Sequence, residues 1–355
     1  MLILAVNHGP TSTKLALFER AQILFSETLT HSPEELSAYS SIAEQYPLRK
    51  EAILKFLSTR NVRASSLAAV VGRGGLTKPL SGGTYLVNEQ MLLDLASAVH
   101  GEHASNLGPR LAWELAQVAG GIPAFIVDPV VVDELDDIAR LTGMPELTRQ
   151  SKFHALNQKA VGRRAARALG RKYIEVNIIV AHLGGGISIG AHKQGRVVDV
   201  NNALDGEGPM SPERSGTVPA GDLVRLCFSG RLSQREILRK LTGSGGLQAH
   251  LGTTDALKVE QRIRSGDTHA LVVYQALAYQ VAKGIAALAA VFCGEVDAVV
   301  LTGGLAHSEL LIGWIKDRVS FLAPVMVYPG EGELEALAQG ALRVLSGEET
   351  PKVYR

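Results

Sequence analysis

The sequence predicts an α/β fold made of two copies of one structural unit that face a central cleft. Short apolar strands alternate with helices along the 355 residues, which is the pattern of α/β proteins. A strand, a glycine-rich polar turn and a second strand occur at the N-terminus and again after residue 177. The same motif in both halves indicates a duplicated unit, and the length independently favours two domains.

The first copy of the motif opens the chain, and a helix with a clear start signal follows it. Ser32 is the expected N-cap, Pro33 takes the first helical position, and Glu35 closes a capping box. The expected strands of the first half are Leu2–Val6, Lys14–Phe18, Ile23–Thr28, Ala68–Val71 and Ala124–Val127. Its other expected helices are Pro47–Ser58, Glu89–His100 and Pro109–Val118.

The second copy repeats the first position by position. Asn7 matches His182, Gly9 matches Gly184, and a hydroxyl residue recurs near the end of each turn, as Thr13 and Ser188. Two ordinary hairpins that look alike by chance are the alternative. The expected elements of this half are strands Ile178–Ala181, Ile189–Ala191, Arg196–Val200 and Asp297–Leu301, a loop Leu204–Gly221, a helix capped by Ser233, and helices Ala270–Phe292 and Leu334–Leu345.

Composition excludes several classes of protein. A formal net charge of +1 gives no electrostatic reason for a nucleic-acid or acidic-membrane partner. Cys227 and Cys293 are too few and too far apart for a disulfide framework or a zinc ribbon, which fits a reducing cytoplasm. The apolar start Met1–Val6 lacks the basic region of a signal peptide. The longest apolar stretch, near Ile285–Cys293, is shorter than the ~20 residues of a bilayer span. We therefore expect a soluble cytoplasmic protein.

Three turns at the ends of apolar strands are rich in glycine and hydroxyls: Asn7–Lys14, His182–Ser188 and Thr302–Gly304. Glycine lets the backbone approach a polyphosphate, and exposed N–H groups and hydroxyls act as donors. None is a Walker A loop, because the first two lead into strands rather than helices. One such turn is weak, but three spread over two halves predict phosphate binding.

Three charged or polar residues could carry chemistry, and each also has a structural explanation. Asp128 ends a strand before Pro129, where open α/β sheets place ligands and where an aspartate also simply initiates turns. His154 lies near a helix start, where a half-buried polar residue is common. Arg214 lies in a stiff loop, Gly208–Gly216, and loops on rigid scaffolds often carry function although exposed arginines are usually only solvated.

Together these motifs resemble the butyrate kinase branch of the acetate kinase family, in the acetate and sugar kinase/heat-shock chaperone/actin superfamily. The resemblance implies a duplicated actin-like ATPase (ribonuclease H-like) fold, with two domains around a nucleotide cleft. It places the first domain over 1–150, completed by the C-terminal helix 334–355, and the second over 151–333. The matching segments are Asn7–Lys14, Arg73–Gly75, Pro79, Gly82–Tyr85, His103–Gly108, Val127–Pro129, Phe153–Lys159, His182–Ser188, Gly206–Gly216, Thr302–Gly304 and Pro329–Leu337.

The resemblance implies reversible, ATP- and Mg²⁺-dependent phosphorylation of a short-chain fatty acid, butyrate or a branched relative, to an acyl phosphate. It also implies a dimer or larger assembly. A branched-chain (isobutyrate) kinase and an acetate or propionate kinase are near alternatives. A sugar kinase would need an aspartate base for a neutral hydroxyl. An actin- or chaperone-like ATPase would need a client domain or polymer surface, and no such addition is evident in the sequence.

The resemblance assigns roles by position. Asp128 corresponds to the aspartate beside the carboxylate and magnesium, and His154 and Arg214 to the residues that stabilise the transferring phosphoryl group. The implied phosphate contacts are Asn7, Ser12, Lys14, His182, Gly184, Gly185, Gly186 and Ser188. The implied adenosine contacts are Asp255, Gly303 and Gly304, and the implied magnesium residues are Asn7, Asp128 and either Glu331 or Glu333.

Two departures from the family pattern concern substrate binding. His8 and Pro10 replace the usual proline and serine of the first turn, so one hydroxyl donor is missing. Val70 stands where acetate kinases carry an arginine, while Arg73 takes the place of a histidine three residues later. We hypothesise that Arg73 grips the substrate carboxylate, since a guanidinium can bind both oxygens. The alternative is that Arg73 braces the turn or an adjacent phosphate.

Overall fold

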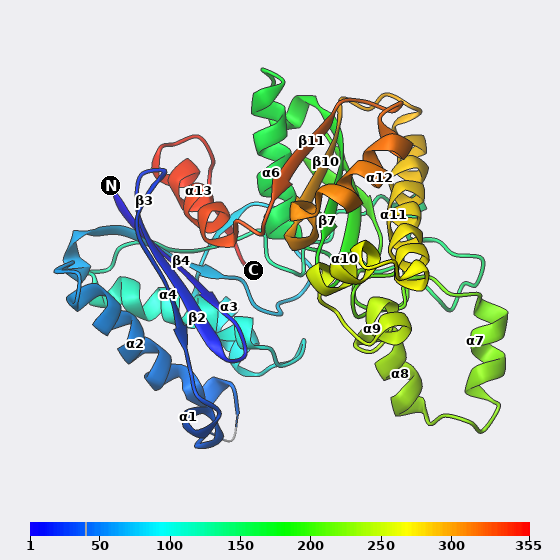
Figure 1. Cartoon of the computed structure of the whole chain (residues 1–355). Helices are drawn as coiled ribbons and strands as arrows, with labels where there is room; N and C mark the ends of the chain where they lie inside the picture. Colours follow the sequence, from blue (N-terminus) through cyan, green and yellow to red (C-terminus); the bar gives the residue numbers. More distant parts are fainter. Residues whose placement is uncertain (40) are drawn as a thin grey trace. The chain divides into compact units, whose positions relative to one another are not determined.

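The computed structural model describes residues 1–39 and 41–355, and the chain forms two compact units (Figure 1). The first unit contains Met1–Val132 and Gly332–Arg355, and the second contains Asp133–Glu331. The C-terminal helix therefore belongs with the N-terminal part. The division falls before residue 133 rather than at 150, because residues of the intervening segment are bonded to the second unit, as Glu134 and Arg149 show.

A seven-stranded sheet forms the centre of the first unit, with the order β12-β5-β6-β4-β1-β2-β3. β1 pairs antiparallel with β2 and parallel with β4, and β4 pairs parallel with β6. The strands are β1 Leu2–His8, β2 Ser12–Glu19, β3 Gln22–Thr30, β4 Leu67–Arg73, β5 Thr84–Leu86, β6 Ala124–Val127 and β12 Lys352–Val353.

Helices cover both faces of this sheet, as strand alternation requires. Leu4, Val6 and Ile126 pack into one core with α2, α3 and α4. Val127 points to the opposite face, where α13 packs, and a Cβ at Gly340 of that helix would come within 2.4 Å of the Val127 side chain. The helices are α1 Pro33–Ser37, α2 Tyr46–Ser58, α3 Glu89–Ala96, α4 Leu107–Val118 and α13 Glu333–Leu345. The capping box of α1 is present as predicted.

The second unit has a five-stranded sheet of order β11-β10-β7-β8-β9. This order and its strand directions repeat β6-β4-β1-β2-β3, with β7 antiparallel to β8 and parallel to β10. The predicted duplication is confirmed. The strands are β7 Asn177–Leu183, β8 Ile187–Lys193, β9 Arg196–Val200, β10 Ala298–Gly303 and β11 Val325–Pro329.

Helices also cover both faces of the second sheet. Ile179 and Ala181 of β7 face the core under α11 and α12, while Ile178 and Val180 face α6. The helices are α5 Asp137–Arg140, α6 Ala155–Ala168, α7 Ala220–Cys227, α8 Gln234–Thr242, α9 Gly246–Leu251, α10 Ala256–Arg264, α11 Thr268–Leu288 and α12 Glu309–Val319. The predicted capping box at Ser233 starts α8.

The two hairpins correspond in register at their first strands but not at their hydroxyls. His8 pairs with Thr13 and Leu183 pairs with Ile187, so Asn7 and His182 each precede the closing pair. The second turn is one residue shorter, so Ser188 lies opposite His182 whereas Thr13 lies opposite His8. The predicted match of Thr13 with Ser188 is therefore a coincidence of sequence spacing.

Helix α11 and the 3₁₀ turn that follows, Thr268–Phe292, are long and apolar enough to cross a membrane by length and composition alone. The uninterrupted apolar run near Ile285–Cys293 is shorter than this helix, because Gln275, Gln280 and Lys283 interrupt the apolar sequence. Tyr274, Leu277 and Val281 are fully buried in the core beneath the second sheet. Over the most apolar 18-residue window of this segment 39% is buried, so one face of the helix packs in the core.

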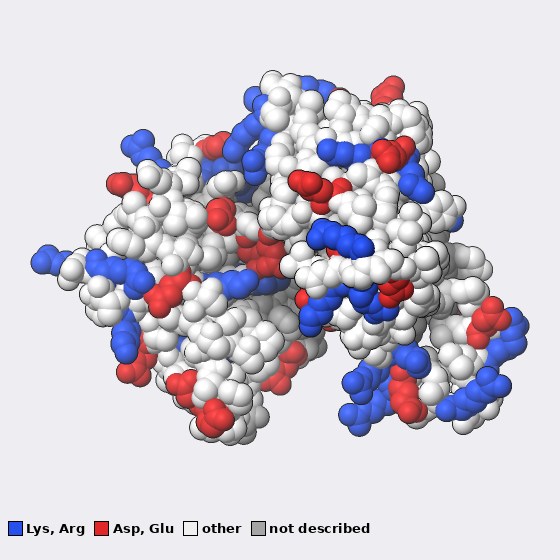
Figure 2. All heavy atoms as spheres, in the orientation of Figure 1, with Lys and Arg blue, Asp and Glu red and all other residues white. Residues whose placement is uncertain are grey.

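Charged side chains are mixed on the surface. On the face shown in Figure 2, acidic and basic residues are interspersed, in keeping with the net charge of +1. No single sign dominates that face.

A buried ion pair fastens the start of the second unit to its sheet. Lys159 Nζ of α6 lies 2.7 Å from Glu134 Oε2, and the two side chains are 2% and 7% exposed. The same oxygen accepts from Val197 N at 2.9 Å, and Lys159 Nζ also donates to Gly195 O at 3.0 Å. Both charges are thus fully compensated inside the protein.

Removing only the cation should therefore be costly. We expect Lys159→Met to lower the free energy of unfolding by about 3–5 kcal/mol, because it leaves a buried carboxylate unpaired. The double variant Lys159→Met/Glu134→Gln should recover most of that loss, since the amide oxygen can still accept from Val197. Urea denaturation of both variants measures the difference. Equal stability of the single and double variants would show that the pair is not the cause.

Candidate active site

In the first unit, predicted site residues gather at one edge of the sheet. Asn7 lies near the end of β1, Arg73 is the last residue of β4, and Asp128 follows β6. Because these three strands are parallel neighbours, their carboxyl ends meet at the same edge, where α/β sheets bind ligands.

Arg73, Asn7 and Glu333 form a hydrogen-bonded cluster at this edge. Arg73 Nη1 lies 3.0 Å from Glu333 Oε1 and 3.3 Å from Asn7 Oδ1. The Asn7 amide donates to the other carboxylate oxygen of Glu333, the first residue of α13. Asn7 is buried, while the Arg73 side chain remains 34% exposed. The cluster holds a partly accessible guanidinium at the sheet edge.

Asp128 is held in an unusual backbone conformation. Its φ of 37° lies in the left-handed region that non-glycine residues rarely adopt. The carboxylate is buried and accepts from Gly83 N at 2.7 Å, and Asp128 N donates to Gly83 O at 3.0 Å. Such strain persists only where the surroundings enforce it, and it is common at functional sites. The backbone of the turn before Pro129 is therefore strained, and the functional role of Asp128 stays a prediction.

A buried arginine that the sequence did not single out braces the first glycine-rich turn. Arg49 of α2 is fully buried, and its Nη atoms donate to Gly9 O, Ser12 O and Pro10 O at 3.0–3.1 Å. Those carbonyls point at Arg49. Arg49 lies four residues before Ile53 on the buried face of its helix. A charged residue on an apolar helix face was the signal that could have identified it.

The replaced residue of that turn, His8, is packed rather than exposed. Its ring is buried and Nδ1 lies 3.4 Å from Thr13 Oγ1, which also contacts His31 Nε2 at 2.9 Å. Burial, with the charges of Arg49 and His31, lowers the pKa of His8 to about 3. His8 is therefore neutral, while Ser12 and Lys14 lie half-buried on the turn.

The second unit has the equivalent edge at the ends of β7 and β10. A Cβ at Gly303, whose φ is 89°, would lie 2.4 Å from Leu183 O. The two backbones approach so closely where the sheet ends that only glycine fits at position 303. Gly304 is exposed with open space beside it. A planar ligand could approach this backbone.

Two predicted histidines stack on each other at this edge. The rings of His154, at the start of α6, and His182, in β7, are 3.8 Å apart and inclined by 12°. His154 Nδ1 lies 2.9 Å from Ser188 Oγ, and His182 Nδ1 lies 2.8 Å from Asn157 Oδ1. Ser188 is fully buried, so it contacts His154 rather than facing out of the turn.

Arg214 lies directly against the second glycine turn. A Cβ at Gly186 would overlap Arg214 Nη1, at 1.8 Å, so glycine is required for the guanidinium to sit there. Arg214 donates to Ala203 O, and its N donates to Ser211 Oγ at 3.1 Å. Its buried Nε has no hydrogen-bond partner within the described residues. Burial lowers the pKa of Arg214, partly opposed by the nearby Glu213 carboxylate.

Two other predicted residues have structural explanations. Asp255 is exposed and caps α10, accepting from Leu257 N at 2.9 Å. Glu331 is exposed, and its carbonyl accepts from Asn157 Nδ2 at 2.6 Å. The adenosine and magnesium roles implied for these residues stay predictions.

The first edge offers oxygen donors that suit magnesium, although it has no cluster of several acidic or metal-binding side chains. Across residues 1–39 and 41–355, no group of three or more His, Cys, Asp or Glu side chains is arranged to hold a metal. Magnesium, however, commonly uses one or two protein carboxylates and completes its shell with phosphates and water. Glu333 and the Asn7 amide oxygen match that requirement, with Asp128 on the same edge.

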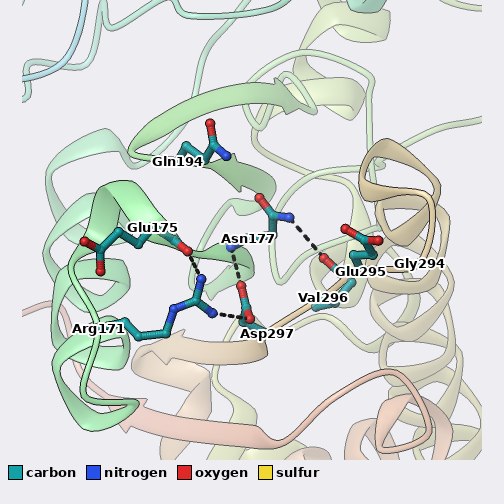
Figure 3. Close-up of a pocket in the computed structure, with 8 residues that line it drawn as sticks. All are labelled: Arg171, Glu175, Asn177, Gln194, Gly294, Glu295, Val296 and Asp297. Carbon is teal, nitrogen blue, oxygen red and sulfur yellow. Dashed lines mark hydrogen bonds and ion pairs between the residues drawn. The ribbon is translucent and has the colours of Figure 1, made fainter.

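A polar surface pocket of about 400 Å³ lies elsewhere in the second unit (Figure 3). Arg171 pairs with Asp297 at 2.6 Å, and Asn177 N donates to the same carboxylate at 2.7 Å. Asn177 begins β7 and Asp297 precedes β10. The pocket thus lies at the amino ends of these strands, opposite the edge with His182 and Gly303, and Arg171, Asn177 and Asp297 of its lining are bonded to one another.

Comparison with known proteins agrees with the motifs. Residues 140–313 match the model of the acetokinase family. The chain is 57% identical over 353 residues to Butyrate kinase 2 of Clostridium acetobutylicum, covering 99% of each.

Solved structures agree on the fold. Acetate kinase of Porphyromonas gingivalis is 20% identical, with a TM-score of 0.77 over 97% of this chain and 99% of that one. A propionate kinase of Francisella tularensis is 21% identical, with a TM-score of 0.73 over 95% and 98%. These likenesses confirm the predicted two-domain, actin-like ATPase fold, and the extended sequence identity shows that this chain belongs to the acetokinase family.

Proposed function

We propose that the chain is a butyrate kinase, which transfers the γ-phosphoryl group of ATP to the carboxylate of a short fatty acid. The observation that carries the proposal is the 57% identity to Butyrate kinase 2 along 99% of both chains. The site residues support it chemically: two sheet edges carry arginines, histidines and glycine-rich turns suited to anions. We further propose cytoplasmic location and a dimeric or larger assembly.

The reaction needs alignment and charge stabilisation more than covalent help. A carboxylate oxygen attacks the γ-phosphorus in line, and the developing charge spreads over the equatorial oxygens. The acid is already ionised at neutral pH, so no general base is needed. Arg214, with its unpartnered Nε in the described chain, and His154 are proposed donors to the transferring group.

The other predicted residues take supporting roles in this proposal. The backbone of Gly184–Gly186 and the turn at Asn7, Ser12 and Lys14 would contact phosphates, and Gly303-Gly304 would face adenosine. Asp128 would position the substrate. When bound, magnesium supplies Lewis-acid neutralisation of phosphate charge. Asn7, Asp128 and Glu333 are the residues proposed to hold it, and Glu333 is preferred over Glu331 because it bonds directly to Asn7.

Acyl-phosphate formation tests the proposed function directly. We expect hydroxylamine-trappable product from ATP, Mg²⁺ and straight or branched acids of three to five carbons. Comparing butyrate, isobutyrate, propionate and acetate ranks the acids. Equal or greater turnover of glucose or glycerol would instead favour a sugar kinase. ATP hydrolysis without any trapped product would favour an actin- or chaperone-like ATPase.

His154 and Arg214 should act mainly in the transition state. We expect His154→Ala and Arg214→Ala each to lower kcat at least ~100-fold while ATP affinity changes little, as for other oriented donors to developing charge. Arg167→Ala, an exposed position on α6, is the matched control and should retain full activity. Steady-state kinetics and nucleotide titration measure both quantities. A kcat within a few fold of wild type in both variants would leave these residues structural.

Arg73 should determine how tightly the acid is bound. Lysine keeps the positive charge but loses the planar pair of donors, so Arg73→Lys should raise the KM for the acid far more than the KM for ATP. Folding is expected to survive, because the ammonium can still pair with Glu333. If the KM for ATP rises and that for the acid is unchanged, Arg73 belongs to the phosphate site.

A further inference from the structure

Buried polar side chains connect His154 to the interior of the second unit. His154 is the N-cap residue of α6, with Gln158 four residues further on, and Ser188 and His192 are four residues apart on β8. The strand spacing places Ser188 and His192 on one face. Gln158, Ser188 and His192 are fully buried, and Tyr173, from a 3₁₀ turn at Tyr173–Glu175, closes the row.

Two glycines make room for this row. A Cβ at Gly190, between Ser188 and His192 on the strand, would lie 2.6 Å from Gln158 Oε1. A Cβ at Gly162, one turn beyond Gln158 on the helix, would lie 2.9 Å from the Tyr173 ring. Any larger residue at either position would push the row apart.

The Ser188 carbonyl sets the direction of the hydrogen bonds. Gln158 Nε2 lies 3.0 Å from Ser188 O and 2.7 Å from Ser188 Oγ. A carbonyl can only accept, so the amide nitrogen must be on this side and Gln158 Oε1 must face His192 Nε2, 2.9 Å away. His192 therefore donates from Nε2.

The far end of the row is consistent with that direction. Burial, together with the charges of Lys159 and Arg163, lowers the pKa of His192 well below 6.5, so the ring is neutral. A neutral ring that donates from Nε2 accepts at Nδ1, where Tyr173 Oη lies 2.6 Å away and donates.

The near end then fixes His154. Ser188 Oγ already accepts from Gln158, and its own proton needs an acceptor. Among the described residues, the acceptor within hydrogen-bond reach is His154 Nδ1, at 2.9 Å. An Nδ1 that accepts carries no proton, so the proton of the ring is on Nε2.

The stacked neighbour is set the opposite way. Asn157 Nδ2 donates to Glu331 O at 2.6 Å, which turns Asn157 Oδ1 toward His182 Nδ1, 2.8 Å away. His182 must therefore donate from Nδ1. The two rings are 3.8 Å apart, and they differ at Nδ1: His154 accepts a hydrogen bond there, and His182 donates one. Two positively charged rings at this distance would repel each other, and a neutral His154 avoids that repulsion.

We propose that Ser188, Gln158, His192 and Tyr173 are positioning residues that fix His154 as the neutral Nε2–H tautomer. His154 then serves the transferring phosphoryl group as an oriented neutral donor rather than as a cation, and it keeps its proton throughout. This catalytic consequence rests on the proposed function, whereas the tautomer itself does not. Ser188 accordingly acts through His154 instead of binding phosphate.

The tautomer is measured by imidazole ¹⁵N chemical shifts of the full chain labelled at histidine, without substrate, above the pH at which free imidazole titrates. The resonance of His154 is assigned by its loss in His154→Gln. We expect a protonated Nε2 and an unprotonated Nδ1. A protonated Nδ1 in the wild type overturns the inference.

Gln158→Glu has nearly the same shape but replaces the Nε2 donor that faces Ser188 Oγ by an acceptor, while His192 can still donate to the other oxygen. The introduced carboxylate has no N–H, so it accepts from the Ser188 hydroxyl, and Ser188 Oγ becomes an acceptor for His154 Nδ1–H. We expect Nδ1 of His154 to become protonated. Ser188→Ala, which does not depend on burying a new charge, should leave a mixture of tautomers. An unchanged tautomer in a folded form of either variant contradicts the proposal.

Kinetics separate positioning from phosphate binding. Ser188→Ala should lower kcat about 10-fold, the value of one lost hydrogen bond, with both KM values unchanged. A raised KM for ATP with unchanged kcat would place Ser188 in the phosphate site and overturn the inference. Ser308→Ala is the matched control: it loses a hydroxyl that caps α12 and bonds to Glu260, so it should lower stability but keep the tautomer and kcat. A wild-type chain that forms no acyl phosphate overturns the proposed function alone.

Discussion

The parallel pairing of the central strands is the constraint on which the rest of the structure depends. β1 beside β4, and β7 beside β10, bring chain segments far apart in sequence to one edge in each unit. The edge also requires close backbone approach. A Cβ at Gly108, where α4 begins, would lie 2.1 Å from Arg73 O, and one at Gly303 would lie 2.4 Å from Leu183 O. The arginine and histidine side chains and the glycine-rich turns lie together at these edges because glycine allows the neighbouring backbones to approach this closely.

The sequence was sufficient to predict the duplicated fold, because the repeated hairpin and the capping boxes are local signals. The helix and strand ends agree within a few residues, as for α4 and α13. The boundary near residue 150 was not recoverable in the same way. What binds residues 133–149 to the second unit is long-range: Glu134 with Lys159, and Arg149 with Asp199. No sequence pattern near Glu134 predicts that it pairs with Lys159, 25 residues further along the chain.

The site shows the same limit. Motifs and the family resemblance pointed to Asn7, Arg73, His154 and Arg214, whose roles stay predictions, because glycine turns and strand ends can be recognised in a single sequence. They did not find the residues behind them. Arg49 holds the carbonyls of the first turn, and Gln158 orients Ser188 in the second. Both are polar residues on buried helix faces, and their roles depend on which atom of each partner faces them, which requires coordinates. The contact of Ser188 Oγ with His154 Nδ1, at 2.9 Å, is of the same kind.

Phosphoryl transfer between two anions needs positive potential where they meet, yet the chain carries a net charge of only +1. Its fixed cations at the two edges are few and restrained: Arg73 is paired with Glu333, and Glu213 lies near Arg214. Neutral donors with fixed proton positions supply stabilisation without adding repulsion between neighbouring cations, and they need no reorganisation as charge develops. Buried rows of hydrogen bonds are worth their desolvation cost only when every member is satisfied. Each member of the row that ends at His154 has a hydrogen-bond partner, so the fold that places these residues also determines which atoms carry the protons.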